Sequence, residues 1–217
     1  IHGGVANETK VHIKSIHSEE ITRENAKDIL AGVDGILVAP GFGSRGIEGK
    51  INAVEYARVN KVPFMGICLG MQCAVVEFAR NVLGYADAHS REMDSNTKHP
   101  VIDIMAEQKN ITNMGGTMRL GAYPCKVSED SNLFRAYGET MISERHRHRY
   151  EFNNNYIEEF KKHGMKITGV NPDTNLVEVV EIEDHPWFVA SQYHPEYKST
   201  VARPHPMFVG FVEAMLK

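Results

Sequence analysis

The sequence is poor in cysteine and has no long apolar run. Its 217 residues contain three cysteines, Cys68, Cys73 and Cys125, which form no Cys-x-x-Cys motif and no paired framework. This usage disfavours a disulfide scaffold and a zinc site, and it is typical of a reducing cytosol. No apolar run approaches the roughly 20 residues of a membrane-spanning helix, and no signal peptide opens the chain. We therefore expect a cytoplasmic protein without a membrane partner.

Basic residues are also in the minority. The chain has 24 Lys and Arg against 28 Asp and Glu, for a formal net charge of -4. Proteins that bind nucleic acid need a basic face to contact phosphates, so we expect no nucleic-acid partner. The apolar fraction of 42% and the length fit one globular domain over residues 1–217.

The most informative stretch present is a cysteine between two glycines. The apolar run at 63–67 predicts a buried strand and residues 71–80 predict a helix. Gly66 and Gly70 lie two residues on each side of Cys68, which is the thiol counterpart of the Gly-x-Ser-x-Gly nucleophile elbow. Small residues leave room for the crowded backbone of such a turn. A helix N-terminus is expected to lower the thiol pKa. The alternative is a buried structural cysteine.

Alternating strand and helix patterns predict the fold class. A buried strand at 35–39, a helix at 47–59 and the strand and helix around Cys68 follow one another. This order predicts an α/β fold with a doubly wound, mostly parallel central sheet flanked by helices. Further patterns predict strands at 11–16, 166–170, 176–182 and 187–193, helices at 24–30, 154–163 and 206–216, and a helix end at 1–4. The segments at 166–170 and 176–182 are expected to form a small antiparallel addition.

A glycine-rich loop at 40–46 follows the first buried strand. It lacks the Gly-Lys-Ser/Thr of a P-loop, which argues against a nucleotide-phosphate cradle. In a parallel sheet the loop lies at the same edge as the cysteine turn. Pro40 has no N–H, so Gly41 is the first residue able to supply a backbone donor for an oxyanion.

A thiol nucleophile needs a proton acceptor, and eleven histidines are available. His194 follows the apolar stretch 187–193, so it is expected above the sheet edge. Glu196 lies two residues further on and is expected to accept a hydrogen bond from the imidazole. The alternative is an ordinary surface pair.

Histidines and arginines alternate in the stretch 144–151, Glu-Arg-His-Arg-His-Arg-Tyr-Glu. In an extended conformation the arginines face one side and the histidines the other. Interleaved arginines disfavour a cation, so we expect no metal site. The stretch is either a solvated basic edge strand or a clamp for a carboxylate.

Taken together, the motifs resemble the class I glutamine amidotransferases, and within them the glutaminase domains of the CTP synthase family. The resemblance is carried by residues 66–72, 194–196, 144–151, 115–121, 42–46 and 204–208 and spans essentially the whole chain. The chain departs from the family at Ala39-Pro40-Gly41, where Pro-Gly-Gly is common.

The resemblance implies that L-glutamine is hydrolysed through a γ-glutamyl thioester on Cys68. His194 would carry the proton and Glu196 would orient it. The backbone N–H groups of Gly41 and Leu69 would form the oxyanion hole, and Arg45 would contact an effector. The residues implied in substrate binding are Gly41, Phe42, Leu69, Gln72, Glu92, Arg149 and Tyr150.

The resemblance also implies partners. No cofactor is expected in this domain. ATP, magnesium and UTP belong to a synthetase domain that nothing in this sequence resembles, and GTP is the expected activator. The chain is therefore expected to be an excised glutaminase domain of a homo-oligomeric enzyme that aminates UTP to CTP. The alternatives are the glutaminase domain of another class I amidotransferase, a catalytically silent regulatory module on the same fold, or a cysteine peptidase.

Overall fold

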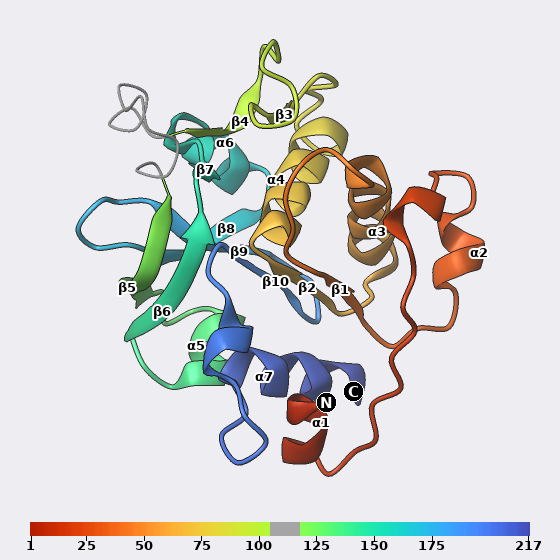
Figure 1. The fold of residues 1–217 in the computed structure, drawn as a ribbon, viewed down its shortest axis with the longest axis vertical. Helices are drawn as coiled ribbons and strands as arrows, with labels where there is room; N and C mark the ends of the chain where they lie inside the picture. Colours follow the sequence, from red (N-terminus) through yellow and green to blue (C-terminus); the bar gives the residue numbers. More distant parts are fainter. Residues whose placement is uncertain (105–117) are drawn as a thin grey trace.

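A seven-stranded sheet with the order β1-β2-β10-β9-β8-β5-β6 crosses the molecule (Figure 1). This computed structural model describes residues 1–104 and 118–217. The strands are β1 (Ile36–Val38), β2 (Phe64–Ile67), β5 (Arg119–Val127), β6 (Met141–His148), β8 (Met165–Val170), β9 (Val177–Ile182) and β10 (Phe188–Ser191). A smaller sheet, in the order β3-β4-β7, contains β3 (His89–Ser90), β4 (Pro100–Ile104) and β7 (Tyr150–Phe152).

Helices cover both faces of the large sheet. The helices are α1 (His2–Ala6), α2 (Ala26–Leu30), α3 (Ile47–Asn60), α4 (Leu69–Asn81), α5 (Asn132–Tyr137), α6 (Ile157–Lys162) and α7 (Pro206–Met215), with 3-10 turns η1 (Ser18–Glu20), η4 (Asn154–Tyr156) and η5 (Pro195–Lys198). In Figure 1, α3 and α4 lie on one side, and α5 and α7 lie on the other beside α1.

Each face of the sheet has its own apolar core. Successive side chains of a strand point to opposite faces, so Phe64 of β2 packs in the cluster under α3 and α4, and Met65 packs in the cluster that includes Met207 and Phe211 of α7. The result is a three-layer α/β/α arrangement. None of the helices in the described ranges combines the length and apolarity needed to span a bilayer.

The expectation of a mostly parallel sheet is wrong. Only the pairings β1–β2 and β2–β10 are parallel, whereas β10–β9, β9–β8, β8–β5 and β5–β6 are antiparallel. Parallel neighbours need a long crossover, which α3 supplies between β1 and β2. Short connections such as the turn between β8 and β9 reverse the chain instead. The fold is α/β with a mixed sheet, and the antiparallel strands form the larger part of it.

Three local predictions also differ from the structure. Residues 11–16 have no regular structure, because this exposed segment pairs with no strand of the described chain. The strand at 35–39 is not fully buried, since Leu37 is exposed on β1 at the sheet edge. The paired glycines lie inside α1 rather than at its end: a Cβ on Gly3 would lie 2.1 Å from the Phe208 carbonyl oxygen, so glycine permits α1 to pack on α7. Residues 115–117 lie outside the described residues.

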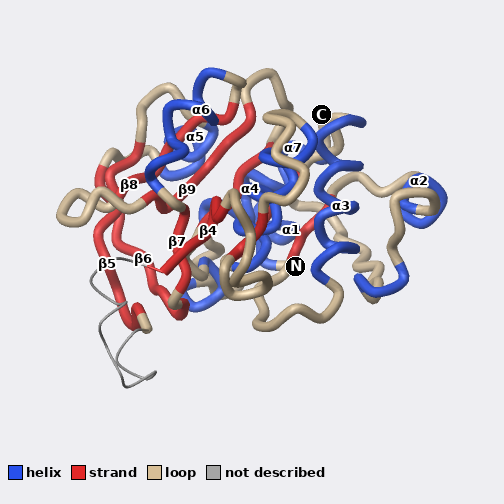
Figure 2. The backbone as a smooth tube through the Cα atoms, turned by 90° about the horizontal axis from the view of Figure 1, so that it is seen from above, coloured by secondary structure: helices blue, strands red, loops and turns tan. Residues whose placement is uncertain are grey.

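The remaining elements agree with the patterns to within a few residues. Figure 2 shows α2 standing at one end of the molecule, away from β5 and β8. The tight strand-to-helix turn at Cys68 depends on two glycines: a Cβ on Gly70 would lie 2.2 Å from the Val38 carbonyl oxygen, and one on Gly66 would lie 2.8 Å from the Gly70 carbonyl carbon. Strands β1 and β2 and helix α4 therefore approach more closely than any side chain at these positions permits.

Replacing Gly70 by Ala should lower the free energy of unfolding by about 1–3 kcal/mol, since the added methyl meets rigid backbone. Gly35→Ala is the matched control, because its methyl would meet the flexible end of Met215 and should cost less. Urea unfolding of both variants measures the difference. Equal losses would contradict the account of the turn.

Candidate active site

Cys68 joins β2 to α4 in a backbone conformation that few side chains adopt. Its φ is 52° and its ψ is -102°. Its N–H donates to the Ser191 carbonyl of β10 over 2.7 Å, and its carbonyl accepts from the Gln72 N–H over 3.2 Å. The hydrogen bonds on both sides hold the turn, and they place the cysteine where the parallel strands β2 and β10 end.

The thiol itself is buried, with Cys68 only 3% exposed. Burial raises its pKa to about 12 from the ordinary 9.0, the carboxylates of Glu151, Glu196 and Glu92 add to the rise, and the Leu69 N–H opposes it. The expectation of a lowered thiol pKa is therefore wrong, because desolvation outweighs the N–H groups of the helix N-terminus. At neutral pH the thiol keeps its proton.

His194 and Glu196 form the hydrogen-bonded pair that their spacing suggested. The His194 Nδ1 lies 2.6 Å from the Glu196 Oε1. The imidazole stacks on the Tyr197 ring with centroids 4.9 Å apart, and the backbone N–H of His194 donates to the Arg145 carbonyl. The carboxylate fixes the proton on Nδ1, so Nε2 is left as an acceptor. This buried Nε2 has no hydrogen-bond partner among the described residues.

A cavity of about 100 Å³ opens beside the Cys68 side chain. This is smaller than the cavities that hold drug-sized ligands, roughly 300–1,000 Å³, so it suits a small molecule. Most of the substrate residues proposed from sequence line it. The lining residues are Gly41, Phe42, Cys68, Gln72, Glu92, Met118, His148, Arg149 and Tyr150.

Four other predicted residues lie at or beyond the edge of this cavity. Leu69 lies against the cavity wall, since a Cβ on Gly41 would be 3.2 Å from its Cδ2. His194 and Glu196 lie past the end of β10 and are not among the lining residues. Arg45 stands apart: its side chain is 80% exposed and pairs with Glu19 over 2.8 Å.

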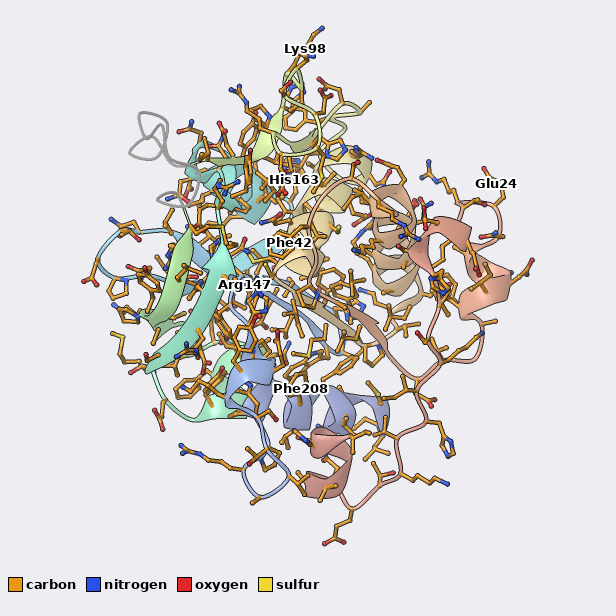
Figure 3. The ribbon with its side chains drawn as sticks, in the orientation of Figure 1. Glu24, Phe42, Lys98, Arg147, His163 and Phe208 are labelled. Atoms are coloured by element: carbon orange, nitrogen blue, oxygen red, sulfur yellow. The ribbon has the colours of Figure 1, made fainter. Side chains whose placement is uncertain are left out.

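Phe42 marks the mouth of the cavity. Its side chain is 62% exposed although it is aromatic. The Arg147 guanidinium of β6 lies over its ring at 5.8 Å from the centroid, and both residues are labelled in the central part of Figure 3. Strand β6 has the predicted alternation, with His146 and His148 buried and Arg145 and Arg147 exposed.

Three residues of this site were not predicted from the sequence. Gln192 Nε2 donates to the Cys68 sulfur at 3.6 Å, and Gln72 Nε2 donates to the Gln192 Oε1 at 3.3 Å. His148 and Met118 line the cavity. Only His148 carried a sequence signal, its place in the 144–151 alternation. Within residues 1–104 and 118–217, no cluster of three or more His, Cys, Asp or Glu has the geometry to hold a metal ion.

The known proteins that this chain resembles in sequence fall into one family. A sequence profile described as "Glutamine amidotransferase class-I" matches residues 1–214. Proteins described as CTP synthase are similar over almost the whole chain: 63% identical over 214 residues in Flavobacterium johnsoniae and 59% over 216 residues in Clostridium beijerinckii. The chain covers 99% and 100% of its own length in these matches and 40% of each relative. It thus spans less than half the length of these curated relatives.

Solved structures give the same grouping. The structure described as "Trypanosoma brucei CTPS - glutaminase domain with bound acivicin" has a TM-score of 0.93 and 38% identity, and the match covers 99% of this chain and 84% of that one. A Thermoplasma acidophilum protein, described as belonging to a GMP synthase, has a TM-score of 0.58 and 18% identity, covering 98% of this chain and 85% of that one. The second likeness concerns the fold alone.

The buried, protonated thiol predicts slow alkylation of Cys68 in the ligand-free chain. Because the folded pKa is raised, the thiolate fraction is small at neutral pH, and the rate with iodoacetamide should still be rising from about pH 7 to about pH 10. Peptide mapping after timed exposure separates Cys68 from Cys73 and Cys125. A rate that levels off below about pH 8 would show a preformed thiolate instead.

Proposed function

This chain belongs to the class I glutamine amidotransferase family, among the glutaminase domains of CTP synthases, and we propose on that premise that it hydrolyses L-glutamine to glutamate and ammonia. The observation that carries the proposal is the position of Cys68, at a strained strand-to-helix turn beside a small polar cavity. A hydrogen-bonded pair, the buried His194 and the exposed Glu196, follows the neighbouring strand.

We propose that the turn at Cys68 is a nucleophile elbow. Because the thiol is protonated at neutral pH, attack on the γ-amide carbon of glutamine needs a base to remove its proton. The unpartnered Nε2 of His194 is suited to take it, with Glu196 stabilising the imidazolium that forms. The same proton then passes to the amide nitrogen, which leaves as ammonia and yields the γ-glutamyl thioester. A water molecule, activated by His194, hydrolyses the thioester to glutamate.

The tetrahedral intermediates carry a negative oxygen that needs hydrogen-bond donors. We propose the N–H groups of Gly41 and Leu69 for this role. Their support is the closeness of the two residues, since a Cβ added to Gly41 would lie 3.2 Å from Leu69 Cδ2, and the position of Leu69 as the first residue of α4, where backbone N–H groups have no intrahelical acceptor.

We propose that Gln72, Glu92, Arg149 and Tyr150 hold the amino-acid end of glutamine. All four line the cavity. A carboxylate such as Glu92 matches the α-ammonium, and a guanidinium such as Arg149 matches the α-carboxylate. Phe42 would close the mouth of the cavity. For Arg45 we retain only an effector role, because it lies in an exposed ion pair away from the cavity.

The wider enzyme is a further part of the proposal. Its basis is the name CTP synthase borne by relatives of which this chain spans 40%. We propose that the ammonia serves ATP-dependent amination of UTP on a synthetase domain of the same polypeptide, in a cytoplasmic homo-oligomer activated by GTP. The similarity to CTP synthases over the whole chain excludes the glutaminase domain of another class I amidotransferase, and a catalytically silent module on the same fold is the competing interpretation.

Replacing Cys68 by Ala should reduce glutamine hydrolysis by about 10³-fold or more, because no other group at the turn can form the thioester. Cys73→Ala, which removes another buried thiol of α4, is the matched control and should keep most of the activity. Glutamate release measured by a coupled assay compares the variants. Turnover retained by Cys68→Ala would refute the proposal.

A covalent probe separates an inactive chain from a chain without a glutamine site. An electrophilic glutamine analogue should add once, on Cys68, and free glutamine should suppress the reaction. Intact-mass analysis and peptide mapping report both results. Labelling that glutamine does not suppress would favour the hypothesis that the chain is a catalytically silent module.

A further inference from the structure

Behind the cavity, five buried ionisable side chains form a closed ring of contacts. Arg119 lies 2.6 Å from Glu178 and 3.4 Å from Glu151. His146 lies 3.5 Å from Glu178, and His148 lies 3.4 Å from Glu151. The two imidazoles close the ring, since His146 Nδ1 lies 2.8 Å from His148 Nε2. The hydrolysis steps proposed for glutamine use none of these five side chains.

The contacts of the ring fix the tautomers of both histidines. His148 Nδ1 lies 3.2 Å from the Tyr150 carbonyl oxygen, which can only accept a hydrogen bond, so this nitrogen carries the proton. His148 Nε2 is then an acceptor, and the proton between the rings belongs to His146 Nδ1. Burial, with the nearby Arg119 charge, lowers the pKa of His146 to about 2 and that of His148 to about 3, which agrees with two neutral rings.

The Tyr150 carbonyl links this ring to the catalytic turn. It also accepts from Gln72 Nε2 over 3.1 Å. Gln72 Nε2 donates in addition to Gln192 Oε1, and Gln192 Nε2 donates to the Cys68 sulfur. A continuous hydrogen-bond chain therefore runs from His146 through the Tyr150 carbonyl to the thiol.

We propose that His148, held by His146 in a fixed tautomer, is a positioning residue that sets the Tyr150 carbonyl and thereby the substrate-binding segment Arg149–Tyr150. The inference rests on the proposed function, because it assigns this segment to glutamine. His148 need not touch the reacting atoms. Its donor holds the carbonyl from one side while Gln72 holds it from the other.

The same tautomers require one more proton in the ring. His146 Nε2 is left as an acceptor facing Glu178 Oε2, and both atoms are buried without a hydrogen-bond partner among the described residues. Two acceptors in contact are unfavourable in a buried site. A proton on Glu178 satisfies both atoms. Burial raises the pKa of both carboxyls of the ring, that of Glu151 to about 8, which favours a protonated carboxyl in the ring at neutral pH. The contact with His146 Nε2 is the reason for placing the proton on Glu178.

The positioning role of His148 is tested by two substitutions that differ in one hydrogen-bond donor. His148→Asn places an amide N–H near the position of Nδ1, whereas His148→Leu removes the donor. In a Cys68→Ala background, which prevents turnover, His148→Leu should weaken glutamine binding roughly tenfold, and His148→Asn should restore most of the affinity. Calorimetric titration with glutamine measures both, and thermal unfolding checks that each variant folds.

His185→Leu is the matched control. This histidine is also buried and also contacts a backbone carbonyl, that of Ala57, but it precedes β10 at the end opposite to the site. It should lower stability without changing glutamine affinity. Equal affinities of His148→Leu and His148→Asn would overturn the proposal. If the Cys68→Ala chain binds no glutamine at all, the proposed function fails first.

Nitrogen-15 NMR of histidine-labelled chain tests the tautomers without any activity measurement. At neutral pH, His146 and His148 should both show a protonated Nδ1 and an unprotonated Nε2, assigned by the loss of each signal on substitution. A protonated Nε2 on either imidazole would overturn the proposed positioning role of His148 even if glutamine binds normally.

The extra proton predicts that Glu178→Gln is tolerated. A Gln side chain can donate to His146 Nε2 and accept from Arg119, as a protonated Glu does, so glutamine affinity should stay within about threefold. Glu178→Leu has neither group and should weaken binding or folding markedly. If Glu178→Gln changes the His146 tautomer in the NMR spectrum, Glu178 is ionised in the native chain and the proton assignment is wrong.

Discussion

The left-handed backbone of Cys68 is the constraint on which the rest of the site depends. A non-glycine residue at φ 52° and ψ -102° costs about 1–3 kcal/mol and persists only where the surroundings enforce it. Here β2 is held between β1 and β10, and the Cys68 N–H is bonded to Ser191. Gly66 and Gly70 let the strands and α4 close around the turn. This backbone conformation places the thiol beside the cavity. It also begins α4 at a point where Leu69 and Gln72 lie against the cavity.

The two halves of the mixed sheet supply different parts of the site. The parallel strands carry Cys68 and lead to the loops of Gly41 and His194. The antiparallel half supplies His148 and, just beyond it, Arg149 and Tyr150, because β6 ends at the cavity. Pairing along β5 and β6 extends from Lys126 opposite Met141 to Arg119 opposite His148, and this long register brings the Arg119 guanidinium to the base of the site.

The sequence predicted the elements around Cys68 well because local patterns define them: an apolar strand, two glycines and a helix. It also predicted the two faces of β6 from simple alternation. It failed where the answer depends on distant partners. Strand direction after residue 118 is set by which strands pair, and residues 11–16 alternate without a partner to pair with. The place of Gln192 in the site could not be predicted for the same reason, since its contact with Cys68 joins residues 124 apart in the chain.

The buried ring also explains why β6 occupies one register. Burying Arg119 and two glutamates costs several kcal/mol in desolvation, so the ring is a weak source of stability. The ring instead selects one pairing register of β6 over the others. A shift of β6 by one residue would turn Arg145 and Arg147 into the core and expose His146 and His148. Only the observed register gives every charge in the ring a partner of opposite sign or a neutral imidazole. The alternation of arginine and histidine therefore specifies both where the strand lies and where the Tyr150 carbonyl is held.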